Sequence, residues 1–187
     1  MGDILIIGCG SAKLDRPAAA KDIYTGSLFR AARRHAETSG KPWRILSAEY
    51  GIIDPDEVIA PYDRRIESRS PPGWVKDPSA ATGQGEHVYW WHALKCSVTA
   101  MLHPNCPEFL LATDRGAGVT WEVHAGRGYV EAWEWAVRQC DAPCGFRSER
   151  GLTFAVEAPL AGLQLGQRLQ WYSRRHGENS AQIGLFG

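Results

Sequence analysis

The chain has 187 residues, enough for one domain with a substantial core, and its 44% hydrophobic and 22% charged residues are typical of a soluble globular protein. Its 21 basic and 21 acidic side chains cancel, so nucleic-acid binding would require a local basic patch. No apolar run is long enough to span a bilayer and no signal-like segment opens the chain. We therefore expect a cytoplasmic protein with no membrane partner and with reduced cysteines.

The hydrophobic pattern predicts strands and helices in alternation. An apolar strand over residues 3–8 ends in glycine, Ser27 caps a helix over 28–39, and a second strand covers 43–47. The later elements are a helical turn at 56–59, a long loop at 64–83, a helix at 86–102, a strand at 109–113, a strand or helix lead-in at 119–125, a helix at 129–139, a strand at 152–156 and a helix at 165–176. This alternation predicts an α/β fold: a single domain over 1–177 with a mostly parallel central sheet flanked by helices, followed by a tail at 178–187.

The first strand leads into a glycine-containing turn, GCGSAK, over residues 8–13. Backbone N–H groups in such a turn can approach an anion, and Lys13 would add a positive charge, so Cys9, Gly10, Ser11 and Lys13 are candidate ligand-binding residues. The turn lacks the spacing of a phosphate-binding P-loop. The alternatives are a simple tight turn with a solvated Lys13, or a nucleophilic Cys9, which no neighbouring histidine in the sequence supports.

The second strand leads into the motifs SAEYG (47–51) and PYD (61–63). Carboxylates beyond a strand end can activate water or stabilise a developing cation, so Asp63 is the first catalytic candidate and Glu49 the second. We interpret Asp54 and Asp56 as turn residues.

Serines and aromatic residues complete the candidate binding site. Ser47, and Ser27 at a helix start, could hold a phosphate or a polar edge of a ligand. Four aromatic residues could stack on a base, although single aromatics more often belong to a core: Tyr24, Phe29, Tyr50 and Tyr62.

A third motif, EVHAGRGY (122–129), places a histidine just before a predicted helix. His124 could donate a proton to a leaving group, with a purely structural role as the equal alternative. The five cysteines do not form the two tight ligand pairs of a structural zinc site, so we expect neither a metal nor another cofactor.

A local basic patch is predicted directly after Asp63. Arginines interleaved with an aromatic residue are suited to nucleic acid, and a solvated loop is the alternative. The candidate DNA-binding residues are Arg64, Arg65, Arg69, Trp74 and Lys76, together with Arg127.

The segments 8–37, 43–63 and 159–171 resemble a family of small bacterial and phage proteins related to YaaA, the peroxide-stress protein. YaaA-type proteins carry a similar segment in place of Tyr50–Asp63, with arginine at the position of Asp63. The resemblance implies DNA binding and a small α/β domain of the YaaA or uracil-DNA-glycosylase type. It also implies a pocket surrounded by Ser11, Lys13, Tyr24, Ser27, Ser47, Tyr50, Tyr62 and Asp63.

Breaking an N-glycosidic bond requires a carboxylate, a few N–H donors and one histidine or tyrosine, with no cofactor. The resulting hypothesis is a DNA glycosylase that leaves an abasic site at a modified base. By family association that base is a glucosylated pyrimidine of phage DNA, and the role is antiviral defence. The alternatives are a non-catalytic DNA-binding stress protein, an N-glycosidase for free nucleotides, and a lyase in which Lys13 forms a Schiff base.

Overall fold

A computed structural model of the chain describes residues 3–66, 74–76, 87–101, 119–144 and 154–183. Its centre is a five-stranded sheet in the order β4-β3-β1-β8-β9. The strands are β1 (Ile4–Gly8), β3 (Trp43–Ser47), β4 (Gly51–Ile53), β8 (Val119–His124) and β9 (Phe154–Glu157). Only β4 is antiparallel to its neighbour, so the predicted α/β domain with a mostly parallel sheet is confirmed.

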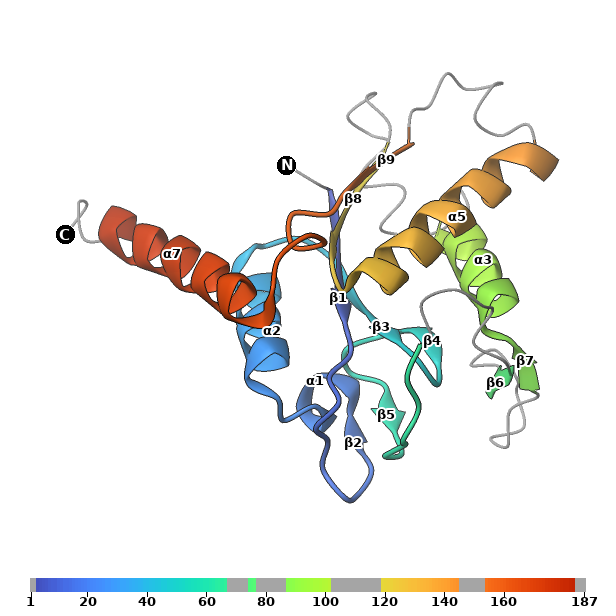
Figure 1. Cartoon of the computed structure of the whole chain (residues 1–187), viewed down its shortest axis with the longest axis horizontal. Coiled ribbons are helices and arrows are strands. Elements are labelled where there is room, and N and C mark those ends of the chain that lie inside the picture. Colours follow the sequence, from blue (N-terminus) through green and yellow to red (C-terminus); the bar gives the residue numbers. More distant parts are fainter. Residues whose placement is uncertain (1–2, 67–73, 77–86, 102–118, 145–153, 184–187) are drawn as a thin grey trace.

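Helices cover both faces of this sheet (Figure 1). On one side lie α2 (Ser27–Thr38) and α7 (Leu165–Ile183), and on the other lie α3 (Trp90–Met101) and α5 (Arg127–Cys144). Because side chains alternate along a strand, β1 supplies both cores: Ile4 and Ile6 pack with α3 and α5, whereas Leu5 and Ile7 pack with α2 and Tyr172 of α7. This double burial explains the continuous apolar sequence of β1.

Smaller elements surround the carboxyl edge of the sheet. The two-residue strand β2 (Ala18–Ala19) pairs with β5 (Val58–Ile59), and the short helix α1 (Ala20–Ile23) follows β2. A second antiparallel pair consists of β6 (Trp74–Lys76) and β7 (His87–Tyr89). None of the helices within the described ranges is long and apolar enough to cross a membrane.

Several predicted elements differ from the structure. The helical turn predicted at 56–59 is wrong, because Val58 and Ile59 pair with a strand far away in the sequence. Part of the predicted loop at 64–83 is strand β6, and the helix predicted from residue 86 begins only at Trp90, after β7. Ser27 is the first residue of α2 and not its cap, since Gly26 occupies the N-cap position. The strand predicted at 109–113 lies outside the described residues, and α7 continues through the predicted tail to Ile183.

Gly8 offers a direct test of how closely the ends of β1 and β8 approach. A Cβ atom at Gly8 would lie 3.1 Å from the Cβ of Ala125, whereas a Cβ at the exposed Gly162 would meet nothing within 4 Å. We expect Gly8→Val to lower the free energy of unfolding by about 1–3 kcal/mol through overpacking, and Gly162→Val to leave it nearly unchanged. Urea denaturation of both variants measures the difference, and equal stabilities would contradict this packing.

Candidate functional site

A small cavity lies at the carboxyl ends of β1 and β8, where the chain reverses its direction across the sheet. From β1 the chain passes through α2 to β3, and it then returns past β1 to reach β8. Open α/β sheets bind ligands in the crevice at such a reversal. The cavity has a volume of about 100 Å³ and takes side chains from five elements or their connections, including Cys9, Phe29, His124, Tyr129, Arg168 and Tyr172.

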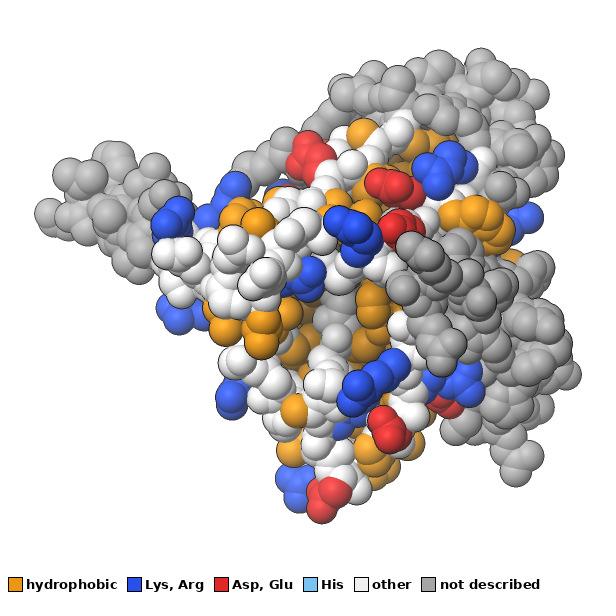
Figure 2. Space-filling view, in the orientation of Figure 1, with side chains coloured by type: hydrophobic (Ala, Val, Ile, Leu, Met, Phe, Trp, Pro, Cys, Tyr) orange, Lys and Arg blue, Asp and Glu red, His pale blue; other side chains and the backbone are white. Residues whose placement is uncertain are grey.

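The volume and walls of this cavity limit what it can hold. Drug-sized ligands occupy pockets of roughly 300–1,000 Å³, so a cavity of about 100 Å³ suits one planar ring or a few waters. Phe29 and Tyr129 provide aromatic surface, and His124, Arg168 and Tyr172 provide polar groups. Figure 2 shows Lys and Arg side chains around a hollow with an apolar floor near the centre of the visible face.

The loop after β1 connects the cavity to a second group of polar side chains. The Cys9 thiol lies 3.2 Å from the Tyr129 hydroxyl, and the Cys9 N–H donates to the Leu46 carbonyl of β3. Gly10 lies between Phe29 and Tyr24, with room for a Cβ at 3.5 Å from each. Ser11 is exposed, and its carbonyl accepts a long hydrogen bond of 3.4 Å from Lys13.

The second group, which we call the tyrosine cluster, consists of Tyr24, Ser47, Tyr50 and Tyr62. Ser47 Oγ donates to Tyr62 Oη at 2.9 Å, and the hydroxyls of Tyr24 and Tyr62 are 3.0 Å apart. Ser47 Oγ also accepts the N–H groups of Glu49 and Tyr50, both at 3.1 Å. A hydroxyl has one donor and two acceptor sites, so Ser47 is fully engaged and holds the cluster together.

Lys13 lies against the tyrosine cluster. Its Nζ is 4.1 Å from the ring centre of Tyr62 and 5.7 Å from that of Tyr24, which is the geometry of a cation–π contact. Burial lowers the pKa of Lys13, although the nearby Cys9 and Asp63 act in the opposite direction. Within the described ranges, no carboxylate forms an ion pair with this ammonium group.

The structure separates the two candidate carboxylates by their surroundings. Glu49 forms an ion pair with Arg64, with 2.8 Å between Glu49 Oε2 and Arg64 Nε, and only 13% of the Glu49 side chain is exposed. Asp63 is exposed and near enough to Lys13 to influence its charge. Asp54 accepts the N–H of Asp56 in a turn, as predicted. Asp63 is therefore the carboxylate with more freedom to reach a ligand.

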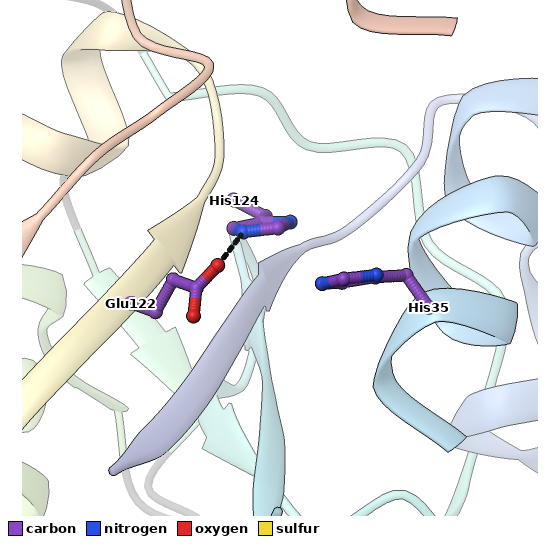
Figure 3. Close-up of side chains that lie close together, drawn as sticks. All are labelled: His35, Glu122 and His124. Carbon is purple, nitrogen blue, oxygen red and sulfur yellow. Dashed lines mark hydrogen bonds and ion pairs between the residues drawn. The ribbon is translucent and has the colours of Figure 1, made fainter. Parts of the chain in front are cut away.

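His124 belongs to a buried polar network at the other end of the cavity (Figure 3). Its Nε2 lies 2.9 Å from Glu122 Oε1, and its Nδ1 lies 2.8 Å from the hydroxyl of Tyr172. Lys41 completes the network by donating to Glu122 Oε2 at 2.8 Å. Burial alone would raise the pKa of Glu122, but the hydrogen bonds from His124 and Lys41 outweigh it and lower the pKa to about 2.

His35 of α2 lies beside this network and raises the question of a metal site. The potential ligand atoms of His35, Glu122 and His124 lie within 4.8 Å of one another. The two imidazole rings are stacked with centroids 5.2 Å apart and an interplanar angle of 11° (Figure 3). The lone pairs of an imidazole lie in the plane of its ring. Two stacked rings therefore direct their lone pairs along parallel planes and not towards one common metal ion. Both nitrogens of His124 and both oxygens of Glu122 already have protein partners. This geometry is that of a hydrogen-bond network.

The structure brings most of the predicted site residues to one edge of the sheet. Cys9, Phe29 and His124 line the cavity, and Lys13 and the tyrosine cluster lie beside it. The candidate DNA-binding residues are dispersed: Arg64 is paired with Glu49, Arg65 and Arg127 are exposed, and Arg69 and the side chains of Trp74 and Lys76 lie outside the described residues. Ser27 is exposed at the start of α2.

Sequence reasoning missed Lys41, Glu122 as a partner of His124, Tyr129, Arg168 and Tyr172. One signal was present, since Glu122 and His124 are two residues apart and therefore face the same side of a strand. The positions of Lys41 and Tyr172 carried no such local signal.

Two comparisons match the N-terminal part of this chain. Residues 4–81 match the sequence profile of a family of unknown function (DUF6884). The "Uncharacterized protein YfjM" of Bacillus subtilis (strain 168) is 33% identical over 66 residues, which cover 32% of this chain and 44% of that protein. No solved structure matches the chain. The chain thus aligns with less than half of this relative's length, and residues 4–81 contain β1, β3 and the tyrosine cluster but neither β8 nor α7.

The pKa values of His35 and Glu122 predict acid sensitivity. Burial and the neighbouring His124 lower the pKa of His35 from 6.5 to about 4, so the unfolded chain takes up this proton first. We expect the free energy of unfolding to fall as the pH drops from 6.5 to 4, and the contribution of Glu122 to be lost between pH 4.5 and 2. Urea denaturation at stepped pH should show a shallower decline between pH 6.5 and 4 for His35→Gln than for the wild type. An unchanged slope would contradict the assignment.

Proposed function

We propose that the protein is an N-glycosidase that binds a base in the cavity between β1 and β8, and that its substrate is DNA carrying a modified base. The observation that carries this proposal is a cavity for a single ring, with aromatic and hydrogen-bonding walls, at the reversal point of a parallel sheet. A glycosylase must hold one extruded base in a fitted pocket, and a ring-sized cavity suits this requirement.

In this proposal the residues around the cavity divide the chemical work. Asp63 activates water or stabilises the sugar cation, because it is the exposed carboxylate beside Lys13, and Glu49 is second because Arg64 already holds it. Phe29 and Tyr129 flank the base. His124 orients the hydroxyl of Tyr172 at the cavity wall and does not contact the base itself, since both of its ring nitrogens are engaged. The resemblance to YaaA-related and uracil-DNA-glycosylase-like proteins is consistent with this division and suggests a role in defence against phages with modified DNA.

Base release from DNA tests this proposal. Purified protein is incubated with unmodified DNA and with several modified phage DNAs, and strand cleavage by alkali and mass spectrometry of released bases are measured. We expect Asp63→Asn to lower the rate by about 100-fold or more, the usual contribution of a general base. Asp56→Asn is the matched control, because Asp56 pairs with Lys21 in a surface turn. Full activity in both Asp63→Asn and Glu49→Gln would remove both carboxylates from the mechanism.

A free nucleotide is the second candidate substrate. The balanced charge of the chain and the pairing of Arg64 with Glu49 favour a small substrate over a long polyanion. The same assay with mononucleotides decides between the two: release from mononucleotides but not from DNA would replace the DNA proposal. Salt-dependent DNA binding without any base release would instead indicate a non-catalytic binding protein.

Lys13 decides between hydrolysis and a lyase reaction. A lysine with a lowered pKa can attack C1′ of the sugar while the base departs with the glycosidic electron pair. The C1′–O4′ bond then breaks, a proton from the lysine nitrogen passes to O4′, and the iminium ion left at C1′ is reduced by borohydride to a stable crosslink. The hydrolytic proposal predicts base release without such a crosslink. Lys21, whose pKa is raised by its hydrogen bond to Asp56, provides the control. A crosslink that Lys13→Ala abolishes and Lys21→Ala retains would assign the lyase mechanism.

A further inference from the structure

A chain of hydrogen bonds runs through the interior from Lys41 to the wall of the cavity. Lys41, just before β3, donates to Glu122 of β8, Glu122 is bonded to His124, and His124 is bonded to Tyr172 of α7. The heavy-atom distances are 2.8, 2.9 and 2.8 Å, and the side chain of His124 is fully buried. The proposed mechanism uses His124 and Tyr172 but assigns no role to Lys41 or Glu122.

The direction of each hydrogen bond in this series follows from the ion pair between Lys41 and Glu122 at its start. An ammonium group can only donate, and the pKa of about 2 keeps Glu122 ionised, so its oxygens can only accept. The proton on His124 must therefore be at Nε2. With a neutral His124, Lys41 and Glu122 form a balanced ion pair, whereas a second positive charge on His124 would leave this buried group with a net positive charge. In the neutral ring Nδ1 accepts, and Tyr172 must donate its hydroxyl proton to it.

This polarity determines what Tyr172 can offer to a ligand. A phenol has one hydrogen to donate, and Tyr172 uses it for His124. Tyr172 Oη has no further partner among the residues that the structure describes, and Tyr172 lines the cavity. Its remaining capacity is to accept a hydrogen bond.

We infer that Lys41 and Glu122, acting through His124, fix Tyr172 as a hydrogen-bond acceptor, so that the ring bound in the cavity must offer it an N–H or amino donor. The inference rests on the proposed function in one respect, namely that the cavity binds a ring. Lys41, Glu122 and His124 are positioning residues, and Tyr172 is the residue that contacts the ligand. A ring that presents only an oxo group or a C–H there would leave the acceptor unpaired, which discriminates against it.

The first test reads the tautomer of His124 and needs no ligand. In nitrogen-15 NMR spectra of the full chain at neutral pH, we expect the proton at Nε2 and a pyridine-type Nδ1. Glu122→Gln should invert this pattern: Lys41 would take the amide oxygen, the amide NH₂ would face Nε2, and the proton would move to Nδ1. Glu37→Gln, which alters a surface ion pair with Arg33, is the matched control and should keep the wild-type pattern. A proton on Nδ1 in the wild type would overturn the inference.

The second test uses 2-aminopyrimidine and pyrimidine, two single rings that differ by one amino donor. Titration followed through the amide signals of Cys9 and Gly126 should show about tenfold tighter binding of the amino compound, the effect of roughly one hydrogen bond. Tyr172→Phe and Glu122→Gln should lose this preference, and Glu37→Gln should retain it. The Glu122→Gln, Tyr172→Phe double variant should be no worse than Tyr172→Phe alone, because Glu122 acts through Tyr172.

The outcomes separate this inference from the proposed function. Equal binding of the two probes overturns the acceptor role of Tyr172, even where base release from DNA is active. Absence of binding by both probes overturns it as well, and the base-release assay then judges the glycosidase proposal by itself. A tenfold preference without any base release supports the acceptor role and leaves the cavity as a ring-binding site of a different activity.

Discussion

The reversal of chain direction between β1 and β8 is the constraint on which the candidate site depends. The segment after β1 turns towards α2 on one face of the sheet, and the segment after β8 enters α5 on the other face. Because these two segments diverge, the parallel strands leave a gap at their carboxyl ends, and side chains from both faces close around it. The absence of a side chain at Gly8 lets the strand ends lie so close that the gap stays small.

Two polar groups flank this gap, and each is anchored in the backbone of the sheet. At the end of β3, Ser47 joins Tyr62 to the following turn, and the indole of Trp90 donates to the Ser47 carbonyl. At the end of β8, Glu122 and His124 join the strand to Lys41 and α7. Leaving a buried polar group unpaired costs about 1–3 kcal/mol, so these connected networks hold their members in a single arrangement. Cys9, after the strand between them, hydrogen-bonds to Tyr62 of the first group and lies 3.2 Å from the Tyr129 hydroxyl.

Local patterns predicted the elements whose burial is periodic. Trp90, Leu94, Val98 and Met101 were expected to form one helix face, and all four are buried in the core. The patterns failed where pairing partners are distant: β5 bonds to β2 across about forty residues of chain, and β6, in a segment whose composition is typical of a loop, pairs with β7 at the start of the predicted helix. Short strands depend on their partners more than on their own propensity, which a single sequence does not reveal.

The sequence by itself determined the α/β architecture and the two polar loops at neighbouring strand ends, and it named Lys13, Tyr62 and His124 as candidates, because strand ends, glycine turns and clustered polar residues are local features. Only the tertiary structure decided which polar groups form hydrogen bonds and ion pairs with each other. It engaged every hydrogen-bonding site of Ser47, paired Glu49 with Arg64 and left Asp63 exposed. It also brought Lys41 and Tyr172 to Glu122 and His124, since contacts between residues far apart in sequence form only when helices pack onto the sheet.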